Sequence, residues 1–212
     1  ETGELKEWMD YGGAAKDLPF HQINHEVNRM LVEKTASVLG NINGKARTED
    51  PANGPAAAAA REAECRVLDM FCGDGNLSVA GGCPHITGIE NNGRAVRSAG
   101  KRAAAAGLRD VNYIREDATV FLRNKKYREE RKQGYTHIIL DPPRAGVKDL
   151  VNDIAALQAP VIIYVSCSPP DLGRDVQGFL QNGYSLQELC PMDMFPHTSH
   201  IETVAVLRLL ER

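Results

Sequence analysis

The chain has 212 residues, of which 42% are hydrophobic and 25% charged, as expected for one globular domain with a core of ordinary size. Its formal net charge of −3 at pH 7 lacks the basic excess of an autonomous nucleic-acid binder, and no apolar run approaches the roughly 20 residues that span a bilayer. Five scattered cysteines, an odd number, favour reduced thiols in the cytoplasm over a disulfide framework.

The first predicted element is a helix that begins after Asn24, a suitable N-cap, and ends at Gly40. Apolar residues recur between them at helical spacing, so this helix should pack on a sheet. The following segment, 41–64, contains Asn-Gly pairs, prolines and consecutive alanines. We expect it to be a flexible insertion, and we assign it no function.

A strand, turn and helix start come next. The strand 67–70 leads into the turn Phe71-Cys72-Gly73-Asp74-Gly75-Asn76. Its two glycines permit a ligand to approach the backbone closely, and the helix that follows presents unpaired N–H groups. The P-loop lysine and the third glycine of the dinucleotide fingerprint are missing. The turn is of the nucleotide-binding type, although a G-x-G sequence alone is equally consistent with a tight turn.

Acidic residues close the next three predicted strands. Glu90 ends the strand 85–90, Asp117 follows the strand 111–115, and Asp141 follows the strand 137–140. An acid at the tip of the second strand can accept both hydroxyls of an adenosine ribose, and Asp117 lies where an acid would hold an adenine amino group. Each carboxylate alone is as consistent with a helix cap or a solvated acid. As a set with the glycine turn, at the ends of four successive strands, they favour ligand binding.

Basic residues concentrate in two segments. Arg94, Arg97, Lys101 and Arg102 lie along a predicted helix, 92–106, which is otherwise rich in alanine. The segment 123–132 mixes Lys and Arg with two glutamates. Charged runs of this kind are usually solvated helix faces, and we interpret both in that way.

The most informative segment is the end of the strand 161–165, where an apolar run gives way to Ser166-Cys167-Ser168-Pro169-Pro170. Ligands bind outside the carboxyl ends of the strands in an open parallel sheet, so a thiol here has the address of an active site. A buried apolar role is also common for free cysteine. The remaining predicted elements are a helix, 171–182, and two strands, 185–191 and 203–210. These strands would form an antiparallel hairpin that closes a mostly parallel seven-stranded sheet.

Several motifs resemble the RNA uracil-5-methyltransferase family. They are Phe20-His21-Gln22-Ile23-Asn24, Asp69-Met70-Phe71-Cys72-Gly73-Asp74-Gly75-Asn76, Asp141-Pro142-Pro143-Arg144-Ala145-Gly146, Tyr164-Val165-Ser166-Cys167 and Asp193-Met194-Phe195-Pro196-His197-Thr198-Ser199-His200-Ile201-Glu202. The resemblance implies an α/β, Rossmann-like S-adenosylmethionine-dependent methyltransferase domain over residues 20–212, with helices on both faces of its sheet. Residues 1–19 would be an N-terminal extension or the remnant of an upstream domain. The chain opens on Glu1, and we expect an excised fragment without the family's N-terminal RNA-binding barrel.

The resemblance also implies a role for individual residues. The positions that it assigns to S-adenosylmethionine are Gln22, Phe71, Gly73, Gly75, Asn76, Glu90, Asp117 and Asp141. Cys167 matches the nucleophile that adds to C6 of uracil, and Glu202 matches the acid that removes the C5 proton. By their position, and not by the resemblance, Pro142, Arg144 and His200 would position the substrate. Ser168 departs from the family, which usually has asparagine after the nucleophile.

Three functions remain open at this point. A uridine C5 methyltransferase would act on a flipped-out uridine of 23S ribosomal RNA, which the form of the motif 193–198 favours, or of tRNA, which suits the absence of iron–sulfur cysteines. An amino-group methyltransferase that holds an amine at Asp141-Pro142-Pro143 is disfavoured by Arg144, since an aromatic residue is usual there. The third is a domain that binds S-adenosylmethionine or RNA without turnover. We expect RNA as partner, a monomer, no membrane, and no metal, because no acid or cysteine cluster accompanies His197 and His200.

Overall fold

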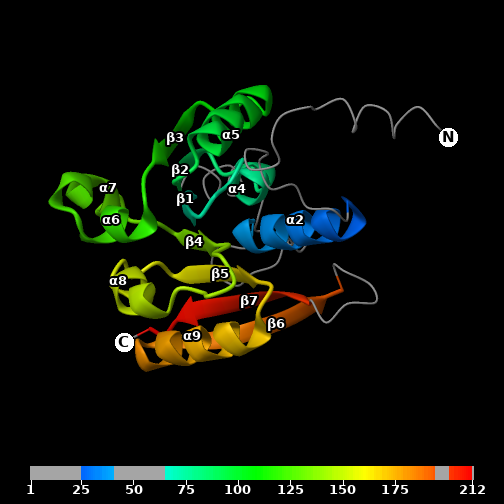
Figure 1. Ribbon diagram of the computed structural model, residues 1–212, viewed down its shortest axis with the longest axis vertical. Coiled ribbons are helices and arrows are strands. Elements are labelled where there is room, and N and C mark those ends of the chain that lie inside the picture. The colour runs from blue at the N-terminus through cyan, green and yellow to red at the C-terminus, as the bar shows by residue number, and fades with distance from the viewer. Residues whose placement is uncertain (1–24, 41–64, 194–200, 212) are drawn as a thin grey trace, which may run out of the picture.

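The computed structural model describes residues 25–40, 65–193 and 201–211, and its centre is a seven-stranded sheet in the order β3-β2-β1-β4-β5-β7-β6 (Figure 1). The strands are β1 (Arg66–Met70), β2 (His85–Glu90), β3 (Asp110–Arg115), β4 (His137–Leu140), β5 (Val161–Ser166), β6 (Tyr184–Met192) and β7 (Glu202–Leu209). The first five pair in parallel, while β7 is antiparallel to both β5 and β6. The predicted sheet and its C-terminal hairpin are confirmed.

The central strands are continuous apolar runs because protein covers them on both sides. Every residue of β4 and β5 is buried, whereas β3 and β6, at the two edges of the sheet, expose several side chains. Successive side chains of a strand point to opposite faces. In β5, Ile162 and Tyr164 therefore pack into one core cluster, and Val161, Ile163 and Val165 pack into the other.

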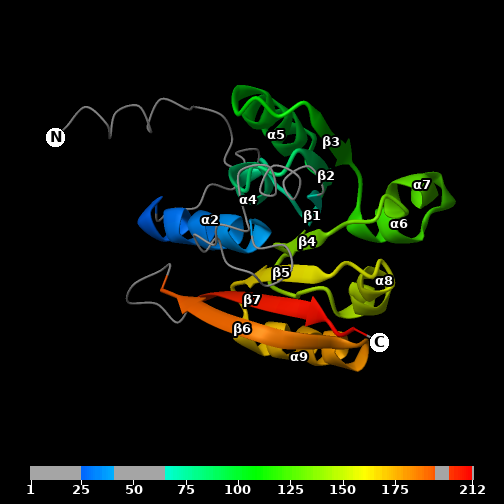
Figure 2. The ribbon, with the colours of Figure 1, turned by 180° about the vertical axis from the view of Figure 1, so that it is seen from behind.

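Helices cover both faces of the sheet, as predicted (Figures 1 and 2). The longer helices are α2 (His25–Leu39), α5 (Gly93–Ala105) and α9 (Pro169–Gln181), and the shorter ones are α4 (Asn76–Ala80), α6 (Ala118–Arg123), α7 (Arg128–Arg131) and α8 (Val151–Ala155). Single 3₁₀ turns occur at Lys125–Tyr127 and Lys148–Leu150. The helices α6, α8 and α9 share a core with one face, and α2 and α4 share a core with the other. Each fully buried Leu or Ile contributes about 1.5–3 kcal/mol to these cores.

The strand register aligns the carboxyl ends of the parallel strands, and the predicted site residues that the structure describes lie along the edge of the sheet that these ends form. Met70 pairs with both Ile89 and Leu140, so the segments that follow β1, β2 and β4 start at the same level. Leu140 pairs with Tyr164, which adds the end of β5 to that level. Because β7 is antiparallel, its first residues lie beside the last residues of β5, with Thr203 opposite Ser166. Glu202 and Cys167 therefore belong to the same edge although they come from opposite ends of their strands.

The prediction of reduced thiols is wrong for two of the five cysteines. Cys65 and Cys83 form a disulfide, with their Cα atoms 5.5 Å apart, and Cys72, Cys167 and Cys190 are free. Each paired cysteine lies just ahead of a strand, and the parallel register of those strands sets Arg66 opposite His85. Neighbouring strand starts thus bring together two cysteines whose sequence positions gave no indication of a pair.

Some predictions fall on residues that the structure does not describe. These are the extension 1–19, the insertion 41–64, the N-cap Asn24, and the site residues Gln22 and His200. Among the described residues, no helix is both long enough and apolar enough to cross a membrane.

Candidate active site

The turn after β1 is fixed by its backbone. Phe71 adopts a left-handed conformation with φ of 62°, which few non-glycine residues do and which costs on the order of 1–3 kcal/mol. The N–H of Cys72 donates to the carbonyl of Ile89 at 3.1 Å, which ties the turn to β2. Gly75 also has a positive φ, of 76°, and a Cβ atom there would lie 2.9 Å from the Tyr113 hydroxyl. Only glycine suits this position without displacing Tyr113.

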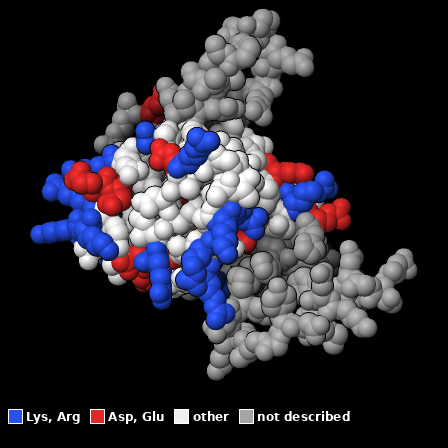
Figure 3. Space-filling view, turned by 90° about the horizontal axis from the view of Figure 1, so that it is seen from above, with Lys and Arg blue, Asp and Glu red and all other residues white. Residues whose placement is uncertain are grey.

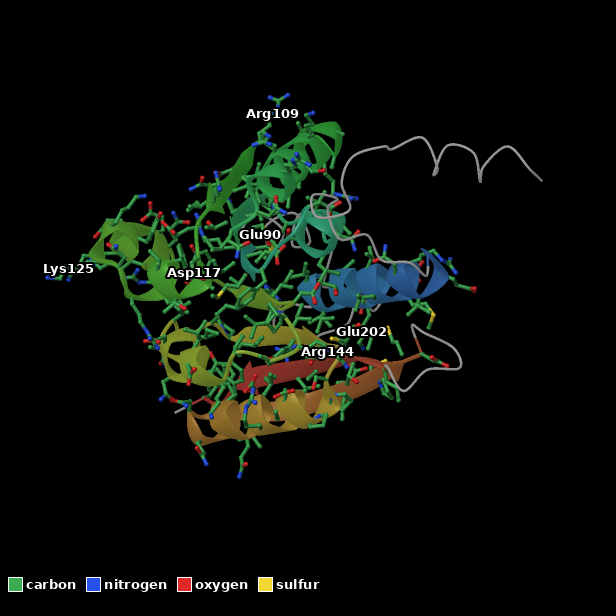
Figure 4. The ribbon with its side chains drawn as sticks, in the orientation of Figure 1. Glu90, Arg109, Asp117, Lys125, Arg144 and Glu202 are labelled. Carbon is green, nitrogen blue, oxygen red and sulfur yellow. A yellow bond between two sulfur atoms is a disulfide. The ribbon has the colours of Figure 1, made fainter. Side chains whose placement is uncertain are left out.

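Glu90 bridges this turn and the start of α5. Its Oε2 accepts a hydrogen bond from the N–H of Gly73 at 3.2 Å, and its Oε1 accepts one from the N–H of Asn92 at 2.7 Å. A carboxylate has about four acceptor sites, so two backbone bonds leave capacity for the hydroxyls of a sugar. Figure 4 labels Glu90, the last residue of β2, and Asp117, which lies in the segment after β3.

Asp117 is the N-cap of α6. Its Oδ1 accepts hydrogen bonds from Thr119 N–H at 2.8 Å and Val120 N–H at 3.2 Å. The capping role, one of the alternatives that the sequence left open, is therefore present. Both bonds go to one oxygen of an exposed side chain, so the second oxygen lies outside the cap and suits a ligand contact as well.

Asn76 connects the glycine turn to α2. Its Nδ2 donates to Oδ1 of Asn28 at 2.8 Å. The side chain is half-buried, between the start of α4 and the helix that follows the motif of Gln22. Gln22 itself lies outside the described residues. The helix that follows it, α2, lies beside the glycine turn.

Asp69, inside β1, is a feature that the sequence reasoning missed. It is 1% exposed, and both its carboxylate oxygens lack a hydrogen-bond partner among the described residues, as do Ser78 Oγ and the Tyr113 hydroxyl. Burial, followed by the charges of Glu90 and Asp74, raises the pKa of Asp69 to about 7. An aspartate within an apolar strand was the available signal. These buried polar groups lie close to one another and to the glycine turn.

The second half of the site contains Cys167, Glu202, Asp141 and Arg144. Cys167 is half-buried after the end of β5, and Glu202 is 5% exposed at the start of β7. Arg144 is exposed in the loop after β4, and Figure 4 shows it near Glu202. Pro142, in the same loop, is buried. The predicted nucleophile, base and substrate-positioning cation therefore come together from three different strand ends.

The electrostatics of this half disfavour negative charge. Burial, and next the Glu202 carboxylate, raises the pKa of the Cys167 thiol, while Arg144 acts in the opposite direction. Burial also raises the pKa of Glu202. Loss of hydration, with Glu202 second, raises the pKa of Asp141 to about 8. A cation that approaches this cluster, or protonation of its carboxyl groups, would favour the thiolate.

A buried aspartate on α9 holds the Arg144 loop in place. Asp175 is 1% exposed, and its Oδ2 accepts hydrogen bonds from Val147 N–H and the Tyr164 hydroxyl, both at 2.7 Å. Arg174 donates to Asp175 Oδ1 through Nε at 2.9 Å and through Nη2 at 2.8 Å. The same Nη2 reaches the carbonyl of Ala145 at 2.8 Å. Sequence reasoning assigned no role to Arg174 or Asp175, because polar residues in a helix look alike until their partners are known.

Ser168, which stands where the family that the sequence resembles usually has asparagine, has defined contacts. Its N–H donates to Ser166 Oγ at 3.1 Å, and its hydroxyl donates to Asp171 Oδ2 at 2.5 Å. Asp171 also accepts a hydrogen bond from Arg174 Nη1 at 2.5 Å. The Ser168 side chain thus links the segment after Cys167 to the network that anchors the Arg144 loop.

No group of three or more His, Cys, Asp or Glu side chains suited to a metal ion occurs within the described part of the chain. His197 and His200 lie outside it.

Comparisons with known proteins agree on one family. The sequence profile of the family described as tRNA (Uracil-5-)-methyltransferase matches residues 54–210. The 23S rRNA (uracil(1939)-C(5))-methyltransferase RlmD of Vibrio parahaemolyticus is 32% identical over 189 residues, which is 88% of this chain and 38% of that protein. The protein of the same name from Klebsiella pneumoniae is 37% identical over 189 residues, again 88% of this chain and 38% of that protein. The chain therefore spans about two fifths of the length of these relatives.

Solved structures also match this chain. The tRNA (uracil-54, C5)-methyltransferase of Pyrococcus abyssi, in complex with S-adenosyl-L-homocysteine, matches with a TM-score of 0.64 and 27% identity, over 89% of this chain and 40% of that one. Magnesium protoporphyrin IX methyltransferase from Synechocystis, with bound SAM, matches with a TM-score of 0.57 at 15% identity over 98% of this chain and 92% of that one. The second likeness concerns the fold alone.

Proposed function

Because the chain belongs to the tRNA (uracil-5-)-methyltransferase family, we propose that it is the catalytic domain of an S-adenosylmethionine-dependent RNA uridine C5 methyltransferase that works through a covalent Cys167 adduct. The observation that carries the proposal is the convergence of Cys167, Glu202 and Arg144 at the same sheet edge as the glycine turn and Glu90.

The chemistry requires these residue types. C5 of uracil is too weak a nucleophile to take a methyl group unaided. The Cys167 thiolate adds to C6, and the displaced electron pair makes C5 part of an enolate, which is nucleophilic. After C5 gains its methyl group, Glu202 removes the C5 proton. The C6–S bond then breaks, the C5–C6 double bond returns, and the thiolate is released.

The residues around the glycine turn suit S-adenosylmethionine, which supplies an electrophilic methyl group when bound. Glu90 retains acceptor capacity for ribose hydroxyls, and Oδ2 of Asp117 lies outside the helix cap. We assign the remaining contacts to Phe71, Gly73, Gly75, Asn76 and Asp141, and to Gln22 outside the described residues. The unpaired oxygens of Asp69 behind the turn fit a site that is completed by a bound polar group or water.

We assign substrate positioning to Arg144, Pro142 and His200. The exposed Arg144 guanidinium suits a phosphate or the edge of the target base, and its approach to Cys167 favours the thiolate. C6 of uracil is not accessible in a stacked helix, so the target uridine is flipped out. We favour 23S ribosomal RNA as the substrate, supported by the names of the bacterial relatives. A tRNA substrate is the alternative, supported by the Pyrococcus abyssi enzyme.

The experiment that tests this proposal is tritium release from RNA that carries C5-tritiated uridine, with S-adenosylmethionine present. The wild-type chain is expected to release tritium, Cys167→Ala none, and Glu202→Gln little. Equal release by wild type and Cys167→Ala would contradict the covalent route. Binding of S-adenosylmethionine and RNA without any release would favour the remaining alternative, a domain that binds without turnover.

A further inference from the structure

One segment of this acidic chain contains only positive charge. Residues 91–109 include Arg94, Arg97, Lys101, Arg102 and Arg109 and no Asp or Glu, in a chain whose net charge is −3. The segment covers all of α5 and the turn that leads to β3. From the sequence we interpreted this run as a solvated helix face, but such faces commonly carry charges of alternating sign, and this segment carries basic residues without any acid.

The geometry of α5 places three of these cations on one line. Ala95, Ala99 and Ala103 are its buried residues, at a spacing of four. Arg94, Arg97 and Lys101 are exposed and, at 100° per residue, lie on the opposite side of the helix. Figure 3 looks down on this end of the molecule, where Lys and Arg side chains project from the surface. Arg109, just before β3, extends the row at the outer edge (Figure 4).

The acids next to α5 are already engaged. Asp74 pairs with Arg102 at 2.5 Å, and Asp110 contacts His85. Glu90 accepts two backbone N–H groups. Within the described residues, Arg97, Lys101 and Arg109 form no ion pair. The other basic segment differs, because Lys132 pairs with Glu129 and Arg123 with Asp153.

We propose that the α5 basic stripe, consisting of Arg94, Arg97, Lys101 and Arg109, docks the phosphate backbone of the RNA at a distance from the target uridine. The choice of RNA rests on the proposed function. The stripe flanks β2 and β3, while Cys167 follows β5, three strands from β2. At about 4.8 Å per strand, this separation is roughly 15 Å, so the stripe contacts nucleotides outside the catalytic pocket.

Guanidinium and ammonium groups on a line suit phosphates, because each contact releases condensed counterions from the RNA. The stripe therefore adds affinity that depends on salt and not on base identity. It leaves S-adenosylmethionine binding and the chemical step unchanged, since none of its side chains belongs to the site described above.

The test is the salt dependence of binding of a fluorescein-labelled single-stranded RNA, measured by anisotropy. The variant Arg97→Gln/Lys101→Gln/Arg109→Gln is compared with the matched control Lys125→Gln/Arg128→Gln/Lys132→Gln, which removes the same charge from α7 and its neighbourhood. At about 0.7 per phosphate contact, the stripe variant should lose about two from the slope of log K against log salt, and the control should keep the wild-type slope. Unchanged melting and S-adenosylmethionine binding show that both variants are folded.

Three results would contradict the proposal that the stripe docks RNA: a wild-type slope in the stripe variant, an equal loss of slope in the control, or no RNA binding by the wild-type chain at low salt. The tritium-release assay distinguishes a failure of this proposal from a failure of the proposed function. If tritium release depends on Cys167 but the stripe variant keeps the wild-type KM for RNA, only the proposed role of the stripe is contradicted. If RNA binding depends on the stripe but no tritium is released, only the proposed methyltransferase activity is contradicted.

Discussion

The carboxylate of Asp175, buried on α9, accepts a hydrogen bond at 2.7 Å from the backbone N–H of Val147, in the loop that carries Arg144. A buried carboxylate with this many donors is stable only while they remain. Because α9 begins directly after Cys167 and Ser168, the same bond ties the loop of Arg144 to the segment that contains Cys167. The Arg144 loop and the segment after Cys167 thus share one buried anchor.

Asp175→Asn should lower the free energy of unfolding by about 2–4 kcal/mol, because Arg174 and the Tyr164 hydroxyl lose a charged acceptor in a buried place. The control is Asp171→Asn on the same helix, a more exposed partner of Arg174, with a smaller expected loss because solvent screens its ion pair. Urea denaturation measures both. Equal losses would show that Asp175 has no special anchoring role.

Gly146→Ala should destabilise the chain by about 1–3 kcal/mol. Gly146 has φ of 72°, and an added Cβ atom would lie 2.2 Å from Asp175 Oδ2. Gly173→Ala is the matched control, since nothing lies within 4 Å of its added Cβ and it sits inside α9, where alanine gains about 0.5–1 kcal/mol. Thermal melting of the two variants should therefore shift in opposite directions, and a shift in the same direction would contradict the close contact.

The reactivity of Cys167 should rise with pH above the range usual for a free thiol, because burial and Glu202 raise its pKa. Glu202→Gln should move the alkylation profile to lower pH, and Arg144→Ala should move it to higher pH. Iodoacetamide labelling, followed peptide by peptide, separates Cys167 from Cys72 and Cys190. Identical profiles in the three proteins would show that these groups do not interact.

Arg144→Ala should also weaken RNA binding without weakening S-adenosylmethionine binding, and an equal loss of both would count against its positioning role.

Asp69 should make the chain less stable as pH rises. Its folded-state pKa, about 7, lies above its ordinary value of 3.8, so the folded state holds its proton more tightly than the unfolded state does. The stabilisation from that proton is complete below about pH 3.8 and is lost as the pH rises through about 7. The free energy of unfolding of Asp69→Asn minus that of wild type should therefore be larger at pH 8 than at pH 5, by on the order of 3 kcal/mol. A constant difference between these pH values, in urea titrations, would contradict the burial of an unpaired carboxyl group.

Much of the fold was readable from the sequence because its signals are local. The apolar run 161–165 predicts a buried strand, which the structure extends by one residue, and the ends of successive parallel strands share an edge, which is enough to group Glu90, Asp141 and Cys167. Contacts that depend on register or on helix orientation were not readable. The disulfide between Cys65 and Cys83 needs the pairing of β1 with β2, and the bond from Asp175 to Val147 needs α9 to lie against a loop 28 residues earlier. The run of basic residues on α5 was visible in the sequence, but the absence of ion pairs at Arg97, Lys101 and Arg109 within the described residues was not.

The most direct test of the central claim replaces the C5 hydrogen of the target uridine with fluorine. Fluorine cannot leave as a cation, so Glu202 cannot complete the release step, and the methylated base should stay attached to Cys167. Intact-mass measurement of the chain after incubation with S-adenosylmethionine and 5-fluorouridine RNA should show a covalent protein–RNA species in wild type and none in Cys167→Ala. An adduct that persists in Cys167→Ala, or uridine methylation by a chain that never forms the adduct, would contradict the account.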